Sequence, residues 1–224
     1  MTAQTIGGII FDLDGVLITT DELHYQSWRE LADAEGIPFD RTINQRLRGV
    51  SRMRSLEIIL ERSSRPYSTT EKEALAERKN DRYRQLLETL THDDLAPGAI
   101  ELLTELRRRG AAIALASSSR NARLILQRLK ITDLFDAIID GNDIRASKPD
   151  PDVFLQCAAR LGVPPEACIV VEDAAAGIEA ARRAGMAVIG IGPPASLPGA
   201  MLIHATLADL TADDLLGTHR SEPS

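Results

Sequence analysis

The segment Phe11-Asp12-Leu13-Asp14-Gly15-Val16 decides the fold of this chain, because in it an apolar run ends in two carboxylates. The run from Ile6 to Phe11 has the length and composition of a buried strand in a parallel sheet. Such a strand delivers the residues that follow it to the carboxyl edge of the sheet, where open α/β folds bind their ligands. Asp12 and Asp14 therefore indicate a ligand site.

An ionised aspartate near a protein core is costly unless a cation or strong hydrogen-bond donors compensate its charge. Two aspartates one residue apart therefore suggest a bound metal ion, and one of them can serve as a nucleophile. The alternative is that Asp12 and Asp14 only begin a turn before Gly15, since aspartate and glycine are ordinary turn residues. The rest of the chain distinguishes these two interpretations.

The bulk properties limit the class of protein. The chain has 224 residues, of which 44% are hydrophobic and 26% charged, as in ordinary globular domains. A net charge of −7 argues against nucleic acid as a partner, because binding its backbone needs a basic face. The sequence holds neither a segment of about 20 apolar residues, which a membrane span needs, nor a signal-peptide pattern. Cys157 and Cys168 are expected to be buried thiols, and we expect a cytoplasmic location.

Two different patterns follow the first strand. The first is helical, with segments expected at 21–35, 53–61 and 71–90 and no convincing strand among them. From about Leu95 onward, helices and short apolar runs alternate. Helices are expected at 98–109, 121–129, 151–161 and 175–184, and strands at 111–116, 137–139, 169–171, 187–191 and 202–203.

The alternation indicates parallel βαβ units with helices on both faces of the sheet. We therefore predict an α/β fold with a Rossmann-like parallel sheet as its core. The predicted core comprises residues 1–17 and 92–224, and an α-helical cap domain, residues 18–91, is inserted after the first strand.

Other polar residues follow the later strands. Ser117 comes directly after the second strand, Glu172 and Asp173 end the fourth, and Lys148 lies between the third strand and the next helix. Each has an ordinary explanation: a serine caps a helix, a lysine before proline is solvated, and acidic residues favour a helix N-terminus. Their joint occurrence in this order favours convergence at one edge of the sheet.

Carboxylates combined with a serine and a lysine suit phosphoryl transfer through an acyl phosphate. Ligands that are all oxygen favour Mg²⁺ over metals that prefer thiolate or imidazole. The sequence therefore predicts a magnesium-dependent phosphotransferase site.

The series Asp12-Leu13-Asp14-Gly15, Ser117, Lys148 and Glu172-Asp173 resembles the four motifs of the haloacid dehalogenase-like phosphotransferases, from Ile9 to about Gly192. Several segments resemble its β-phosphoglucomutase branch in particular. They are Leu47-Arg48-Gly49-Val50-Ser51-Arg52, Arg78-Lys79-Asn80-Asp81, Ala114 to Asn121 and Ala146-Ser147-Lys148-Pro149, together with His24 after Thr20.

The resemblance implies a role for each matching residue. Asp12 would be the nucleophile, and Asp14 the general acid and base. Ser117 and Lys148 would bind the transferring phosphoryl group, and Thr20 and His24 would belong to a hinge that positions Asp14. The metal ligands implied are Asp12, Asp14 through its backbone carbonyl, Glu172 and Asp173.

The resemblance also implies a substrate-binding set. Arg52 would hold the second, non-transferring phosphate, because an arginine can bind it with two parallel hydrogen bonds. The plain alternative is a solvated arginine at the start of a helix. The other residues of the set are Lys79, Gly49, Ser51, Trp28, Ser118, Ser119, Arg120 and Asn121.

Two positions depart from the family pattern. Thr19 stands where an aspartate is common, and Ala174 stands where a serine often follows the acidic pair. Neither position carries a charge that the implied mechanism needs, so the expected reaction is unaffected.

The implied reaction interconverts β-D-glucose 1-phosphate and glucose 6-phosphate, with Mg²⁺ as cofactor and glucose 1,6-bisphosphate as activator and intermediate. A mutase must exclude water and offer a sugar hydroxyl instead, which a helical lid can achieve. The alternatives are a phosphatase of a small phosphomonoester and a non-catalytic sugar-phosphate-binding protein. We expect a sugar phosphate as the partner, and a monomer without nucleic-acid or membrane binding.

Overall fold

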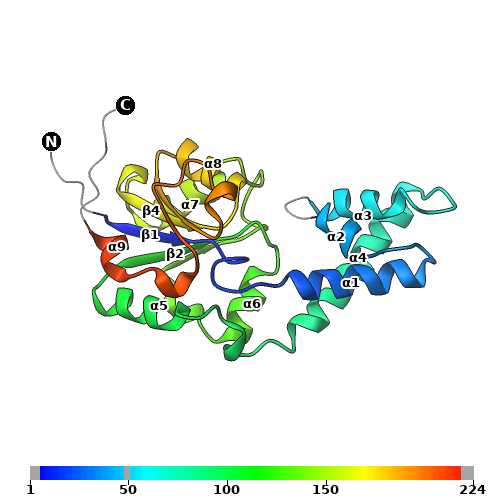
Figure 1. Cartoon of the computed structure of the whole chain (residues 1–224), viewed down its shortest axis with the longest axis horizontal. Coiled ribbons are helices and arrows are strands. Elements are labelled where there is room, and N and C mark those ends of the chain that lie inside the picture. Colours follow the sequence, from blue (N-terminus) through cyan, green and yellow to red (C-terminus); the bar gives the residue numbers. More distant parts are fainter. Residues whose placement is uncertain (1–5, 48–50, 218–224) are drawn as a thin grey trace. The chain divides into compact units, whose positions relative to one another are not determined.

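The computed structural model describes residues 6–47 and 51–217 (Figure 1). Its centre is a six-stranded sheet with the order β3-β2-β1-β4-β5-β6, in which every neighbouring pair is parallel. The strands are β1 (Gly8–Phe11), β2 (Ala112–Ala116), β3 (Ala137–Ile139), β4 (Cys168–Glu172), β5 (Ala187–Ile191) and β6 (Leu202–His204). This confirms the predicted α/β fold with a parallel sheet.

β1 is one of the two central strands of the sheet, and all four of its residues are buried. It pairs with β2 on one side and with β4 on the other, so the strand order changes direction between β1 and β4. Ligands of open α/β sheets bind outside the carboxyl ends of the strands at such a point. The residues that follow β1 and β4 therefore occupy the ligand-binding edge.

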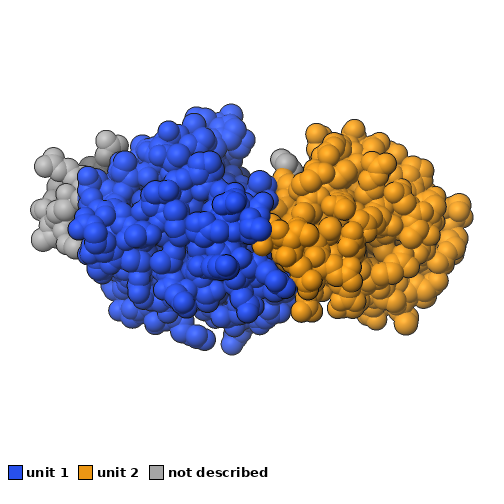
Figure 2. Space-filling model, turned by 90° about the horizontal axis from the view of Figure 1, so that it is seen from below, with its two compact units in different colours: residues 1–19, 91–224 blue, residues 20–90 orange. Residues whose placement is uncertain are grey.

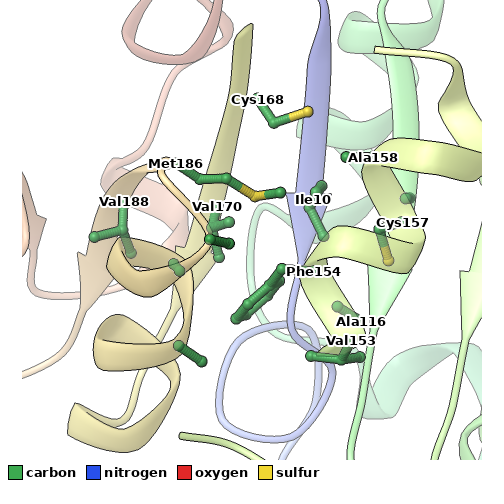
Figure 3. Packing of buried hydrophobic residues seen from close by; sticks show 14 of the residues in the cluster. Ile10, Ala116, Val153, Phe154, Cys157, Ala158, Cys168, Val170, Met186 and Val188 are labelled. Carbon is green, nitrogen blue, oxygen red and sulfur yellow. The ribbon is translucent and has the colours of Figure 1, made fainter. Parts of the chain in front are cut away.

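Helices cover both faces of this sheet, and α5 lies across it from α7 and α8 (Figure 1). Alternate strand residues point to opposite faces, so Ile10, Val170 and Val188 share one face. They pack there against Phe154 and Met186 (Figure 3). The α-helices that follow residue 91 are α5 (Ala99–Arg108), α6 (Ala122–Leu129), α7 (Asp152–Leu161), α8 (Ala175–Arg183) and α9 (Ala212–Leu216).

The chain divides into two compact units, residues 1–19 with 91–224 (unit 1) and residues 20–90 (unit 2), which Figure 2 distinguishes by colour. The described part of unit 2 is helical: α1 (Asp21–Ala34), α2 (Arg41–Gln45), α3 (Arg52–Leu60) and α4 (Thr69–Leu87). It has its own apolar core, in which Trp28 from α1, Leu56 from α3 and Leu75 from α4 are buried.

The long helices and the strands lie within a few residues of the predicted segments, but α2 and α9 were not predicted. Each has only five residues, which is too short for a helical period to be visible in the sequence. Both begin at a side-chain cap. The Asp40 carboxylate accepts a hydrogen bond from the Ile43 N–H at 2.9 Å, and Thr211 and Asp214 form a capping box.

Two further expectations concern the whole chain. Cys157 and Cys168 are free and buried, as predicted. Among residues 6–47 and 51–217, none of the helices combines the length and the apolar character that a bilayer crossing requires.

Candidate active site

Three charged groups meet at the carboxyl edge of the sheet in unit 1. The Lys148 ammonium donates to Asp12 Oδ1 at 2.5 Å and to Glu172 Oε1 at 2.8 Å. Its third hydrogen bond goes to the backbone oxygen of Ala116 at 3.2 Å. Residues from three separate predicted motifs are thereby brought together, as the strand-end argument requires.

These groups are buried, and burial shifts their protonation equilibria. Burial raises the pKa of Asp12 well above its ordinary value, against the lowering effect of Lys148. Burial alone would lower the pKa of Lys148, but Asp12 and Glu172 outweigh it and hold that pKa above its ordinary value. Burial and the charge of Glu172 raise the pKa of Asp173 to about 7. More negative charge is gathered here than one lysine neutralises.

The acidic groups fit a divalent cation. One carboxylate oxygen from each of Asp12, Glu172 and Asp173 lies within 4.8 Å of the others. All three ligand atoms are hard oxygen donors, and the raised pKa values of Asp12 and Asp173 show charge that a cation would compensate. This donor set suits Mg²⁺. The backbone carbonyl of Asp14 stays a predicted fourth ligand, and the Asp14 side chain is half-buried.

Two glycines allow the backbone to approach the acidic groups closely. Gly15 has a φ of +90°, and a Cβ atom there would lie 1.9 Å from Asp173 Oδ2. A Cβ atom at Gly177, in the first turn of α8, would lie 1.7 Å from Glu172 Oε1. Side chains at either position would displace a carboxylate, so these glycines shape the acidic cluster.

Ser117 is buried at the end of β2 and organises the loop that follows. Its hydroxyl oxygen accepts from the Ser119 N–H at 3.0 Å, and the Ser119 hydroxyl accepts from the Asn121 N–H at 3.2 Å. Asn142 supports the same loop by donating to the backbone oxygen of Arg120 at 3.0 Å. Ser118 and Arg120 are exposed. The predicted phosphate-binding segment is thus a turn fixed by its own hydroxyl groups.

The predicted site residues of unit 2 form a second cluster, centred on Lys79. The Lys79 ammonium lies 2.9 Å from His24 Nδ1, 4.9 Å from the centroid of the Trp28 ring and 4.5 Å from that of Tyr83. Thr20 is buried and accepts a hydrogen bond from the Tyr83 hydroxyl at 3.1 Å. Four of the predicted residues, Thr20, His24, Trp28 and Lys79, are therefore linked through direct contacts or through Tyr83.

Both basic groups of this cluster have lowered pKa values. Burial, followed by the charges of Lys79 and Arg52, lowers the pKa of His24 to about 3. Burial and the charge of Arg52 lower the pKa of Lys79 to about 7. His24 is therefore neutral at physiological pH, while Lys79 titrates in that range.

Arg52 is the first residue of α3, and the hydroxyl of Ser51 caps this helix by accepting from the Arg54 N–H at 3.3 Å. The Arg52 guanidinium donates to Asn80 Oδ1 at 2.8 Å and lies 3.7 Å from a Glu77 carboxylate oxygen. It is a partly exposed cation held by polar neighbours, as a phosphate-binding group would be. Gly49, the remaining predicted residue, lies outside the described residues.

The sequence analysis did not single out Tyr83 or Gly177. Tyr83 follows Lys79 by four residues, which places both on one face of the predicted helix, so helical spacing was an available signal. Gly177 follows a run of three alanines, four residues after Asp173, but a glycine near the start of a helix has several explanations. Only the fold shows that its missing side chain leaves room for Glu172.

A family model described as haloacid dehalogenase-like hydrolase matches residues 6–185. The chain belongs to this family. The acidic cluster after β1 and β4 and the lysine between its members are the residues that gave the sequence this resemblance.

Comparison with individual proteins shows which members of this family the chain resembles. The chain is 46% identical over 207 residues to a β-phosphoglucomutase from Bacillus subtilis, which covers 92% of both chains. A crystal structure of a β-phosphoglucomutase from Clostridium difficile matches with a TM-score of 0.84 at 40% identity, covering 93% of this chain and 94% of that one. A fructose-1-phosphate phosphatase from Escherichia coli is 34% identical over 84% of this chain and 97% of its own. The chain is an enzyme that transfers phosphoryl groups.

We predict that Gly177→Ala lowers the affinity for Mg²⁺ by about ten- to a hundredfold, because the added methyl group displaces the Glu172 carboxylate. The helix itself should tolerate the change, since alanine is a better helix former than glycine. Isothermal titration calorimetry with Mg²⁺ measures the effect. Ala176→Ser, at an exposed position of the same turn, is the matched control. Equal Mg²⁺ affinity of the wild type and Gly177→Ala would contradict this account of Gly177.

A second prediction concerns stability and pH. The pKa of Lys79 is about 7 in the folded protein and about 10.4 in an unfolded chain, so between these values the unfolded state binds more protons. The free energy of unfolding of the wild type should therefore rise, relative to Lys79→Met, as the pH increases from 7 to 10. Below pH 7 the full cost of the buried ammonium is present, and Lys79→Met should be more stable.

Urea unfolding of both proteins at pH 6, 8 and 9.5 checks this expectation. The difference between the two proteins cancels the titration of the groups that they share, except that of His24, whose pKa depends on the charge of Lys79. A difference that stays constant over this range would show that Lys79 keeps an ordinary pKa in the folded protein.

Proposed function

We propose that this enzyme is a β-phosphoglucomutase that interconverts β-D-glucose 1-phosphate and D-glucose 6-phosphate. The observation that carries the proposal is the 46% identity to the Bacillus subtilis β-phosphoglucomutase over 92% of both chains. It is supported by the acidic cluster and the neighbouring polar residues at the ends of β1, β2 and β4, to which the proposal assigns the roles of nucleophile and phosphate-binding groups.

In the proposed first step, an oxygen of Asp12 attacks a phosphorus of β-glucose 1,6-bisphosphate, the bond from phosphorus to the sugar oxygen breaks, a glucose monophosphate leaves, and Asp12 becomes an aspartyl phosphate. Lys148 already contacts Asp12, so its ammonium is placed to bind an oxygen of the transferring group. Ser117 contributes its buried hydroxyl to the same group. Mg²⁺, held by Asp12, Glu172, Asp173 and the backbone of Asp14, would neutralise negative charge on the phosphoryl oxygens.

Asp14 is proposed as the general acid and base. It gives a proton to the departing sugar oxygen and takes one from the hydroxyl that attacks the aspartyl phosphate in the second step. When that hydroxyl is O6 of β-D-glucose 1-phosphate, the products are β-glucose 1,6-bisphosphate and free Asp12. The bisphosphate then turns around, Asp12 attacks its 1-phosphate, and glucose 6-phosphate leaves as Asp12 becomes an aspartyl phosphate again. Asp14 follows Asp12 by two residues in the loop between β1 and α1, so one strand end would supply both functions.

The intermediate of this proposal is β-glucose 1,6-bisphosphate, which also activates the enzyme by phosphorylating Asp12. Its second phosphate needs an anchor of its own, for which Arg52 is the proposed residue. The other residues proposed to contact the sugar phosphate outside unit 1 are Lys79, Ser51, Trp28 and Gly49. Those proposed within unit 1 are Ser118, Ser119, Arg120 and Asn121. Thr20 and His24 are proposed to couple the cap to Asp14.

The proposal also includes the expected division into domains, the oligomeric state, the location and an alternative function. Residues 1–17 and 92–224 are proposed as the catalytic core and residues 18–91 as the cap. A cytoplasmic monomer is part of the proposal, and a small sugar phosphate as substrate is supported by the names of the relatives. A phosphatase of a small sugar phosphate is the second candidate, because a fructose-1-phosphate phosphatase is 34% identical to this chain.

The first experiment follows β-D-glucose 1-phosphate by ³¹P NMR in the presence of enzyme and Mg²⁺, with and without a catalytic amount of glucose 1,6-bisphosphate. We expect glucose 6-phosphate to form, with a strong dependence on the bisphosphate and little inorganic phosphate. Asp12→Asn should lower the rate at least about a thousandfold, because the variant lacks the nucleophile. Asp133→Asn, at an exposed position, is the matched control. Inorganic phosphate and glucose as the main products would identify a phosphatase.

A further prediction tests the proposed anchor. Arg52→Ala should lower kcat/KM for glucose 1,6-bisphosphate by about ten- to a hundredfold, the value of one or two charge-assisted hydrogen bonds. Arg54→Ala is the matched control, because Arg54 lies on the same helix with an exposed side chain that pairs with Glu57. If both variants lose activity equally, the role of Arg52 as a phosphate anchor is wrong.

A further inference from the structure

Tyr83 is a buried residue of α4 that joins three of the proposed site residues but has no role in the mechanism above. Its exposed fraction is 1%. Its ring stacks on the imidazole of His24, with centroids 4.0 Å apart and an angle of 20° between the planes. Its hydroxyl donates to the Thr20 hydroxyl at 3.1 Å. The centroid of the same ring lies 4.5 Å from the Lys79 ammonium.

These contacts determine how His24 is protonated while Lys79 is charged. An ammonium group donates hydrogen bonds and cannot accept one, so Lys79 donates to Nδ1 of His24 over their 2.9 Å separation. Nδ1 then carries no proton, and the single proton of the neutral imidazole lies on Nε2. His24 therefore offers a hydrogen-bond donor at Nε2, on the opposite side of its ring from Lys79.

The Tyr83 ring holds this arrangement in two ways. It covers one face of the imidazole, which fixes the plane in which Nδ1 and Nε2 point. It also offers its negatively polarised face to the Lys79 ammonium, as Trp28 does at 4.9 Å. The buried cation thus has two aromatic faces and one imidazole nitrogen as neighbours, which restrict the directions of its N–H bonds.

The hydroxyl of Tyr83 connects this cluster to the beginning of unit 2. Thr20 precedes α1, and the division between the two compact units falls between Thr19 and Thr20. Thr20 is also six positions after Asp14 in the chain. The Tyr83 hydroxyl therefore fixes a residue at the boundary, while its ring fixes His24 one turn further along α1.

We propose that Tyr83 is a positioning residue, which acts on phosphoryl transfer by holding Thr20, the His24 ring and the Lys79 ammonium in one arrangement. The proposal rests on the proposed function for its catalytic part, because Thr20, His24 and Lys79 act on the substrate only if that function is correct. Its structural part, the fixed Nε2–H form of His24, does not depend on the reaction.

The charged and titratable groups around the cluster come from three helices. His24 belongs to α1, Lys79 and Tyr83 to α4, and Arg52, at the start of α3, lowers the pKa of both His24 and Lys79. The Lys79 pKa of about 7 makes the ammonium form dominant at pH 6, which is therefore the condition for observing the His24 tautomer.

The test compares Tyr83→Phe, Tyr83→Leu and the control Tyr25→Leu with the wild type. Tyr25 is a second buried tyrosine of the same unit, whose ring stacks on Phe39 at 5.7 Å. Long-range ¹H–¹⁵N NMR spectra at pH 6 report the tautomer of His24, assigned with a His24→Asn variant. Steady-state assays with β-D-glucose 1-phosphate give kcat and KM, and circular dichroism confirms that each variant is folded.

We expect the wild type and Tyr25→Leu to show the Nε2–H form of His24. Tyr83→Phe keeps the ring and should show the same form, with kcat three- to tenfold lower because Thr20 loses the hydrogen bond from the Tyr83 hydroxyl. Tyr83→Leu should lose the single Nε2–H form and lower kcat by more than tenfold, with KM changed less than threefold. A loss in kcat that exceeds the change in KM is the mark of positioning, which mere filling of the core would not produce.

Several results would overturn the proposal. They are a wild-type His24 with its proton on Nδ1 at pH 6, a folded Tyr83→Leu with unchanged tautomer or unchanged kcat, and equal losses in Tyr25→Leu and Tyr83→Leu. If Tyr83→Leu does not fold, Tyr83→Phe decides, because it lacks a single oxygen atom, and an unchanged kcat overturns the role of the hydroxyl.

The failure of the proposed function would look different. A wild-type enzyme that only releases inorganic phosphate, or that turns over no sugar phosphate, contradicts the mutase. The NMR comparison of Tyr83→Leu with Tyr25→Leu then still tests whether Tyr83 fixes His24 and Lys79.

Discussion

The interaction on which unit 1 depends is the double hydrogen bond from Lys148 to Asp12 and Glu172. Parallel strands that are buried on both faces leave their following residues at the edge of an apolar layer, where carboxylates are costly. One lysine compensates part of this charge and holds two strand ends together. The excess that remains, visible in the raised pKa values of Asp12 and Asp173, is what makes the edge a cation site. Burial of these carboxylates lowers the stability of the fold, and it also leaves negative charge that a bound cation can compensate.

Unit 2 presents the opposite electrostatic problem. There a lysine is buried among aromatic rings, with Arg52 as a further positive charge and His24 as its hydrogen-bond partner. The result is a lowered pKa for both Lys79 and His24, since burial and like charge act in the same direction. The two basic side chains of this cluster, Lys79 and Arg52, are the electrostatic counterpart of the acidic edge in unit 1. In the proposed reaction, the acidic group of unit 1 would hold the cation and the basic residues of unit 2 would bind an anionic group of the substrate.

Local sequence signals predicted the elements unevenly. β1 was evident because an uninterrupted apolar run ends abruptly in two carboxylates, and the helix of Asp21–Ala34 because its apolar positions recur over fourteen residues. α2 and α9 were missed because five residues do not establish a period, and their stability comes from caps at Asp40 and Thr211 and from tertiary contacts. The exact ends of helices were also uncertain, since capping depends on the backbone conformation that the neighbours impose.

The sequence by itself determined the α/β class, the helical insert and the identity of the acidic and basic residues at the strand ends, because alternating strand and helix periods and abrupt strand ends are local features. It also provided the family resemblance that the comparisons confirmed. Only the tertiary structure decided that Lys148 bridges Asp12 and Glu172, that Gly177 makes room for Glu172, and that Tyr83 unites Thr20, His24 and Lys79. These relations join residues from different strands, helices and loops, and their distances follow from how the elements pack, which no local pattern encodes.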